Sequence, residues 1–228
     1  MSSLLEKIRL RGHYRVVIRP CTFDAARIPN ISSLYPIVER AAVELRGWDF
    51  PHIERPPRPH IDIDWVGQES EWQCYLEVWR LYKSGQFVDM SGIASDWLDH
   101  ASWRQPPEGW KPGTHLGILD TIYLFSEVFE FAARLALTEA GDDLMHIEVT
   151  LRGLRGRFLE MDDPRRWPVY HQQAASIDEL PYLHDVQRAD LVARPNELAV
   201  APTLEVFRRF GWDPTEDLIR DMQTKRRM

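Results

Sequence analysis

The sequence predicts an α+β fold: a largely antiparallel or mixed sheet of about six strands, covered by one long buried helix and followed by a C-terminal helical hairpin. Several short segments alternate between apolar and polar residues, which is typical of half-buried strands. Residues 114–140 are apolar around most of a helical circumference, which is typical of a buried helix. Strands and helices do not alternate regularly, and this pattern excludes a doubly wound parallel sheet.

In the first part of the chain, the sequence predicts helices and strands one after another. Residues 1–12 are amphipathic and predict a short helix, and residues 13–19 predict a strand that Pro20 stops. Capping residues near position 30 begin a helix that runs to Ala42, because serine and asparagine satisfy free backbone N–H groups there. Residues 43–46 then alternate like a strand.

The middle of the chain predicts antiparallel strands between two irregular segments. Residues 51–59 are rich in proline and predict an extended loop. Residues 60–66 alternate throughout and predict a half-buried strand. Residues 75–82 and 86–90 flank a short glycine-containing turn and predict a hairpin. Residues 96–115, rich in tryptophan, proline and glycine, predict a long ordered loop.

The last part of the chain begins with the long helix, for which Thr114 is the predicted cap and Gly141 the terminator. Residues 144–151 predict another strand, and residues 152–185 give no assignment. Residues 191–200 predict a small hairpin before two closing helices, the second of which starts with a capping box.

The composition fits a globular chain of 228 residues, which we divide into an α+β domain over 1–200 and a helical hairpin over 201–228 packed on it. Of the 28 basic residues 24 are arginine, which is typical of a GC-rich bacterial genome. Cys21 and Cys74 are too few for a disulfide framework, and the N-terminus lacks the features of a signal peptide, so we expect a cytoplasmic protein. The apolar stretch 116–137 carries four ionisable residues, and we expect no membrane span.

The first candidate site is a metal site at His60, Asp62 and Asp64. On one strand a period of two places these side chains on one face, and this set suits Mg²⁺, Mn²⁺ or Zn²⁺. A metal there could activate water, so one hypothesis is a metal-dependent hydrolase of the phosphodiesterase or nuclease class. His52 and Asp49 would join the site if the proline-rich loop folded back, and His146 and Glu148 would join it if their strand were a neighbour. The alternative is that His60 to Asp64 show the ordinary polar face of an amphipathic strand.

The second candidate is a polar stripe on the long helix, made of Asp120, Glu127, Glu130 and Arg134. A buried stripe would fit a small-ligand-binding regulator with its pocket between this helix and the sheet. The alternative is a solvated helix edge on which Glu130 and Arg134 form an ion pair one turn apart.

The third candidate is the loop that carries Trp97, Trp103 and Trp110, because tryptophan is a frequent anchor in protein interfaces. The first hypothesis is therefore a non-catalytic binding or accessory subunit that acts through a protein partner, either another protein or a second copy in a homo-oligomer. The net charge of −7 argues against nucleic acid, and the segment 152–166, with a net charge of +2, is a weak anion patch.

Motifs of the best-known enzyme classes are absent from the sequence. There is no phosphate-binding loop, dinucleotide fingerprint, nucleophile elbow or H-E-x-x-H pair. We therefore name no catalytic residue and no cofactor, apart from the divalent metal of the hydrolase hypothesis, and leave open whether the chain is an enzyme.

Overall fold

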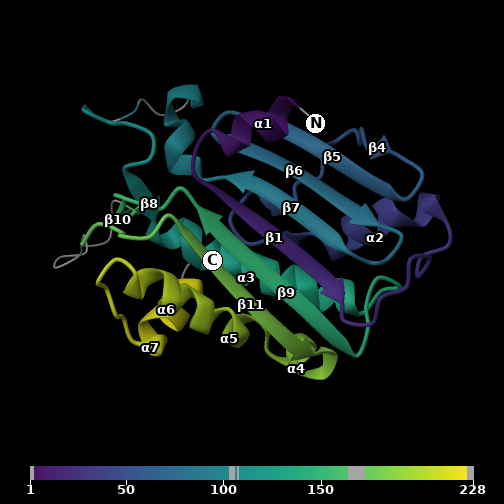
Figure 1. The fold of residues 1–228 in the computed structure, drawn as a ribbon. Coiled ribbons are helices and arrows are strands. Elements are labelled where there is room, and N and C mark those ends of the chain that lie inside the picture. Colours follow the sequence, from purple (N-terminus) through teal and green to yellow (C-terminus); the bar gives the residue numbers. More distant parts are fainter. Residues whose placement is uncertain (1–2, 103–105, 107, 164–172, 225–228) are drawn as a thin grey trace.

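The computed structural model describes residues 3–102, 106, 108–163 and 173–224. Its centre is an antiparallel sheet of seven strands, so the predicted fold class is confirmed. In spatial order the strands are β11 (Glu179–Gln187), β9 (Leu144–Arg152), β1 (His13–Pro20), β7 (Phe87–Gly92), β6 (Tyr75–Tyr82), β5 (Trp65–Trp72) and β4 (His60–Ile61) (Figure 1).

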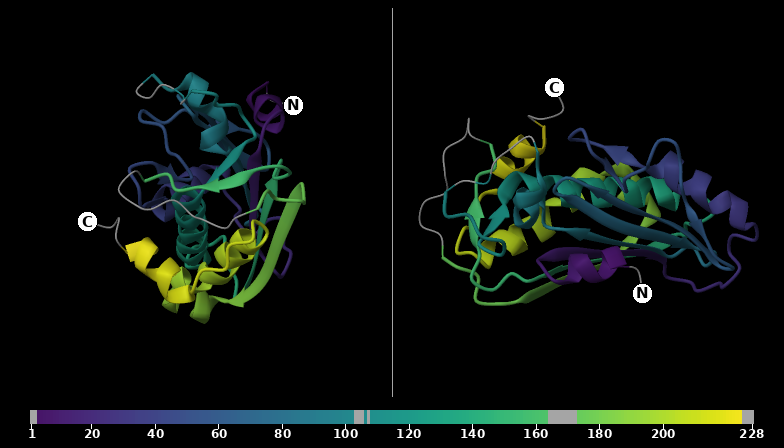
Figure 2. Two further views of the ribbon diagram at one scale, coloured as in Figure 1. Left: turned by 90° about the vertical axis from the view of Figure 1, so that its left-hand side faces the viewer. Right: turned by 90° about the horizontal axis from the view of Figure 1, so that it is seen from above.

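The long helix α3 (Ile118–Ala136) packs on the inner face of the sheet. Figure 2 shows it and α1 on opposite sides. Its rings Phe125, Phe129 and Phe131 are fully buried, and Phe131 lies 4.6 Å from the ring of Phe87 on β7. Burial of such rings is the main favourable term in folding, because it removes apolar surface from water.

The start of α3 differs from the prediction. A short strand, β8 (His115–Gly117), precedes the helix and pairs in parallel with β10 (Phe158–Glu160). The cap comes from a distant residue: both oxygens of Asp162 accept the backbone N–H groups of Leu119 and Asp120, at 2.8 and 2.9 Å. Burial and the charge of Asp120 raise the pKa of Asp162 to about 6. Sequence capping rules look only at adjacent residues, so they miss a cap from another segment.

The outer face of the sheet carries the N-terminal helix α1 (Ser3–Arg9) over β6 and β7. Leu4 and Ile8 pack there in a second apolar cluster. Cross-strand ion pairs occupy part of the face beyond the helix, including Arg15 with Glu148. This explains why β1 and β9 alternate between apolar and polar residues.

The remaining helices pack around α3. Between β1 and β5 lie the 3₁₀ turn η1 (Ile31–Ser33), α2 (Leu34–Ala41) and the two-stranded ribbon of β2 (Val43–Glu44) and β3 (Asp49–Phe50). After β11 the chain forms α4 (Arg188–Ala193), α5 (Pro195–Leu198), α6 (Val200–Arg208) and α7 (Glu216–Thr224), all of which contact α3. The hairpin predicted over 191–200 is therefore wrong. Pro195 begins a helical turn there, where its missing N–H costs nothing.

Two further predictions are corrected. The strand predicted over 60–66 is a tight hairpin, in which β4 ends at Ile61 and β5 begins at Trp65. The segment predicted as a loop over 96–115 begins inside a 3₁₀ helix, η2 (Ala94–His100). The apolar–polar alternation of 60–66 continues through the turn, so it did not show where the backbone reverses, and the composition of 96–115 did not show the short helix.

Candidate functional site

The predicted metal residues lie in the β4–β5 hairpin. His60 pairs with Gly67, and the backbone then turns through Asp62 and Asp64, all with exposed side chains. Asp62 uses its own carboxylate to accept the N–H of Ile63 at 2.8 Å. In the part of the chain that the structure describes, no group of three His, Cys, Asp or Glu side chains could hold a metal ion. The metal assignment therefore stays a prediction, and the geometry gives it no support.

The wider metal site, in which His146 and Glu148 join this hairpin, is wrong. β9 and β4 stand at positions two and seven of the sheet, so these side chains do not converge. His146 instead pairs with Asp185 on β11, and Glu148 pairs with Arg15 on β1.

The tryptophans of the predicted partner-binding loop have structural contacts. Trp97 is 2% exposed and packs beneath α1, with the guanidinium of Arg11 4.1 Å from its ring centre. Its burial leaves little indole surface for a partner. Trp110 is half-buried and donates its indole N–H to the carbonyl of Ser95 at 3.0 Å. Trp103 lies outside the described residues, and the partner-binding role of this loop stays a prediction.

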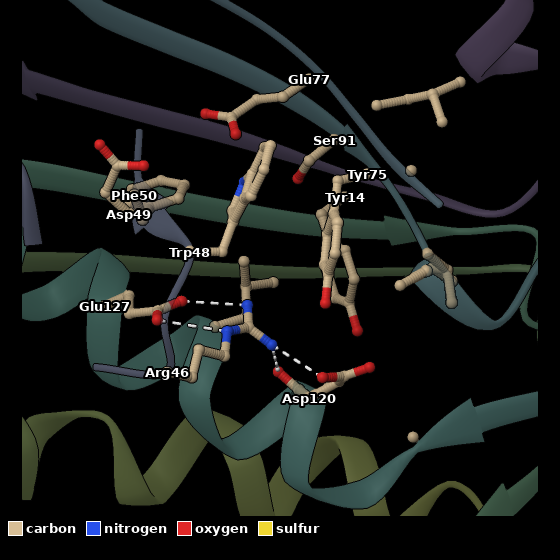
Figure 3. A pocket seen from close by; sticks show the side chains of 16 residues that line it. Tyr14, Arg46, Trp48, Asp49, Phe50, Tyr75, Glu77, Ser91, Asp120 and Glu127 are labelled. Atoms are coloured by element: carbon tan, nitrogen blue, oxygen red, sulfur yellow. Dashed lines mark hydrogen bonds and ion pairs between the residues drawn. The ribbon is translucent and has the colours of Figure 1, made fainter. Parts of the chain in front are cut away.

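A cavity of about 60 Å³ lies between α3 and the sheet, where one hypothesis placed a ligand pocket (Figure 3). We call it the interior cavity. Arg46 lines it and bridges two carboxylates of the predicted helix stripe. It donates to Asp120 at 2.9 Å and lies 3.0 Å from an oxygen of Glu127. The other half of the stripe faces away, and Glu130 and Arg134 form the predicted ion pair at 3.3 Å.

Two buried carboxyl groups, Glu127 and Glu77, line this cavity, and a third, Asp89, lies on the strand next to that of Glu77. Burial is the main cause that raises the pKa of Glu127 to about 7, and Arg46 opposes it. Burial also raises the pKa of Glu77 to about 7 and that of Asp89 well above its ordinary value, and the charge of Glu77 raises Asp89 further. Glu77 and Asp89 are 4% and 0% exposed on neighbouring strands. Burial and the repulsion between the two carboxylates therefore favour the protonated form of this pair.

A stack of four aromatic rings begins beside this carboxyl pair. The ring of Trp48 lies 3.8 Å from His52 on one side and 4.7 Å from Tyr75 on the other, with Trp72 at 5.7 Å. All these rings lie within 14° of parallel. Trp72 is 54% exposed, so the outer end of the stack is open to solvent.

His52 is fixed from two directions. Its Nδ1 pairs with Asp49 at 2.5 Å, and its backbone N–H donates to Glu77 at 2.9 Å. Burial alone would lower the pKa of His52, but the hydrogen bond and charge of Asp49 outweigh it and raise that pKa. Burial alone would raise the pKa of Asp49, but the hydrogen bond and the charge of His52 outweigh burial and lower that pKa. The pair therefore behaves as an ion pair that orients the ring against Trp48.

The stack forms one wall of an open groove of about 630 Å³, which we call the aromatic groove. Its charged lining residues are four acids and two arginines, besides His52: Glu44, Asp49, Glu54, Glu71, Arg55 and Arg58. Trp48 and Asp49 line both this groove and the interior cavity, so the two spaces share one wall.

No protein-family model, curated protein or solved structure matches this chain. The site must therefore be judged from its own geometry.

Sequence reasoning missed most of this site, although one signal was present. Glu77 lies two residues from Trp79 on one strand, and Asp89 lies two residues from Phe87 on the next, so each acid shares a strand face with a buried aromatic residue. An acid on the apolar face of a strand is a sign of function, because burying a carboxylate is costly. Trp48 gave no such signal, because its stacking partners come from residues 52, 72 and 75.

Proposed function

We propose that this chain is a non-catalytic binding protein whose aromatic groove receives a basic side chain of a partner protein. The observation that carries the proposal is the stack of parallel rings with an open outer end, bordered by carboxylates. Large aromatic anchors within a polar rim are typical of interface hot spots.

A guanidinium or ammonium group suits this stack because the face of an indole ring attracts cations. The chain makes the same contact twice within itself. Arg80 lies 4.1 Å from the ring centre of Trp65, and Arg11 lies at the same distance from that of Trp97. Trp72, which is 54% exposed, offers a comparable ring at the groove, and there a cation would come from outside.

The net charge of the whole chain, −7, favours a basic partner. A field of this sign speeds the encounter with a positively charged surface. Within the groove, Asp49 is paired with His52 and Glu71 with Lys7, and Glu44 and Glu54 are balanced by Arg55 and Arg58. The arginine-rich composition, and the finding that Cys21 and Cys74 form no disulfide, support a bacterial cytoplasmic setting for this interaction.

A second candidate is a regulator that binds a small amine, and the interior cavity favours it. At about 60 Å³ the cavity has room for a few water molecules or one small polar group. Pockets for drug-sized ligands are several times larger. A compact cation could enter beside Glu77, whereas a larger ligand would have to occupy the aromatic groove.

The test is an NMR titration of the indole N–H resonances with acetyl-arginine-amide and with its uncharged counterpart acetyl-citrulline-amide. We expect the arginine compound to shift the resonances of Trp48 and Trp72, and the citrulline compound to leave them in place. Trp72→Ala should weaken the binding, whereas Leu183→Ala, which removes an exposed apolar side chain elsewhere, should not. Equal shifts by the two compounds would overturn the proposal.

A further titration separates the two candidates. Arginine within a short peptide should bind more tightly than free agmatine if the groove serves a protein partner, because flanking residues add contacts. Tighter binding of agmatine would favour the small-amine regulator.

A further inference from the structure

A second cleft, of about 490 Å³, lies at the same end of the sheet as the aromatic groove. In the strand register, His13 of β1 pairs with Arg152 of β9 and with Gly92 of β7. One residue before Gly92, Ser91 pairs with Glu77 of β6, which pairs in turn with Ser70, a residue that lines the aromatic groove. The cleft lies where the end of α1, the start of β1 and the segment after β9 meet. We call it the arginine cleft because five arginines line it: Arg9, Arg11, Arg152, Arg155 and Arg157.

Two of these arginines build the wall and are neutralised there. Arg157 and Asp96 are each 1% exposed and form a bidentate ion pair, at 2.7 and 2.5 Å. Arg11 donates to both oxygens of Asp99 at 3.1 and 3.2 Å and lies over the ring of Trp97. Neither guanidinium is available to a ligand without loss of these contacts.

The other arginines leave the cleft with excess positive charge. Arg155 is exposed and has no ion pair within the described ranges of the chain. Arg152 pairs with Glu179 at 3.1 Å, but both side chains are about half exposed, and such a pair holds weakly. Among these residues two carboxylates, the lining Asp178 and the Arg152 partner Glu179, stand against the three arginines Arg9, Arg152 and Arg155.

The pKa of His13 responds to the positive charge in the cleft. Its side chain is buried at the base of the cleft, and its Nδ1 lies 3.0 Å from the carbonyl of Arg11. Burial is the main cause that lowers the pKa of His13, and the positive charges of Arg152 and Arg9 lower it further. An anion bound in the cleft would oppose those charges.

We infer that the arginine cleft binds a small molecule that carries a phosphate group. Guanidinium groups bind phosphate through paired hydrogen bonds, and Arg9, Arg152 and Arg155 approach the cleft from two separate segments. Apart from charged residues and His13, the lining consists of Gly12, Gly113, Gly153, Pro112 and Leu10, which offer no aromatic ring for stacking a base. Recognition therefore rests on the anionic group. The volume fits a phosphorylated metabolite, and the net charge of −7 disfavours long nucleic acids.

The experiment measures binding of inorganic pyrophosphate, of glycerol 3-phosphate and of uncharged glycerol by calorimetry at low ionic strength. We expect both phosphates to bind and glycerol not to bind. Arg155→Gln should weaken phosphate binding by about fivefold to tenfold, since it removes one charge-assisted contact. Arg188→Gln is the matched control, because it removes one exposed arginine from α4, outside the cleft.

An NMR titration of the His13 ring locates the bound anion. Binding in the cleft should raise the pKa of His13, whereas binding elsewhere should leave it unchanged. Absence of phosphate binding, equal weakening by Arg188→Gln, or an unmoved His13 pKa would each overturn the inference. Tighter binding of glycerol 3-phosphate than of pyrophosphate would assign the cleft to phosphate esters, and the reverse order would assign it to the inorganic anion.

Discussion

Replacing Glu77 with glutamine tests the carboxyl pair behind the aromatic groove, because it removes one charge and keeps the size of the side chain. Glu77 is 4% exposed and accepts the backbone N–H of His52 at 2.9 Å, a bond that a glutamine oxygen can keep. The variant also removes the charge of Glu77, which raises the pKa of Asp89. We expect the variant to fold and to be more stable than the native protein at high pH.

The magnitude follows from the pKa of Glu77, which burial raises from 4.5 to about 7. A carboxyl with a raised pKa favours the folded state below pH 4.5, and this contribution is lost as pH rises through 7. The loss amounts to about 3 kcal/mol at 1.36 kcal/mol per pH unit. Glutamine does not titrate, so the stability difference between Glu77→Gln and the native chain should grow by about that amount from pH 4.5 to pH 8.

Urea denaturation at several pH values measures this difference. Glu179→Gln serves as the control, because Glu179 forms an exposed ion pair and its loss should change stability by less than about 1 kcal/mol. A stability difference for Glu77→Gln that stays constant with pH would refute the argument that the native carboxyl is held protonated by burial.

The remaining predictions concern the core, the groove and the metal hypothesis. Asp96→Ala leaves the guanidinium of Arg157 buried without its carboxylate and should cost about 3–5 kcal/mol in urea denaturation; adding Arg157→Met should recover part of that loss. Phe131→Ala should cost about 3–5 kcal/mol, because the ring is fully buried under the sheet. Trp72→Ala should change the free energy of unfolding by less than about 1 kcal/mol while weakening arginine binding, since the ring is 54% exposed. Mn²⁺ should leave the melting temperature unchanged if the exposed hairpin His60 to Asp64 binds no metal, whereas a metal at 100 times its Kd would stabilise by about 2.7 kcal/mol.

The sequence predicted those elements whose residues carry their own signal. β1 and β9 each have an apolar inner face, β6 and β7 flank a glycine-containing turn, and α3 is apolar nearly all round. The edge strand β11 was missed because polar and exposed residues, among them Leu183 at 59%, interrupt its pattern.

The candidate site was harder to predict because its residues come together only in the folded chain. Half of the helix stripe, Asp120 and Glu127, does face a cavity beside the sheet, but the cation that binds them is Arg46, 74 positions before Asp120. The sequence showed Trp48 as one tryptophan among nine, with no sign that it lies between His52 and Tyr75.

The position of β1 in the middle of the sheet has a consequence for synthesis on the ribosome. One side of β1 pairs with β7, which is complete at Gly92, but its other side pairs with β9, which ends only at Arg152. At about 5–20 residues per second, the roughly 60 intervening residues take about 3–12 s to emerge. During that interval the first half of the sheet has an unpaired edge and no α3 to cover its apolar face. A nascent chain at this stage should bind chaperones that recognise exposed strands and apolar surface.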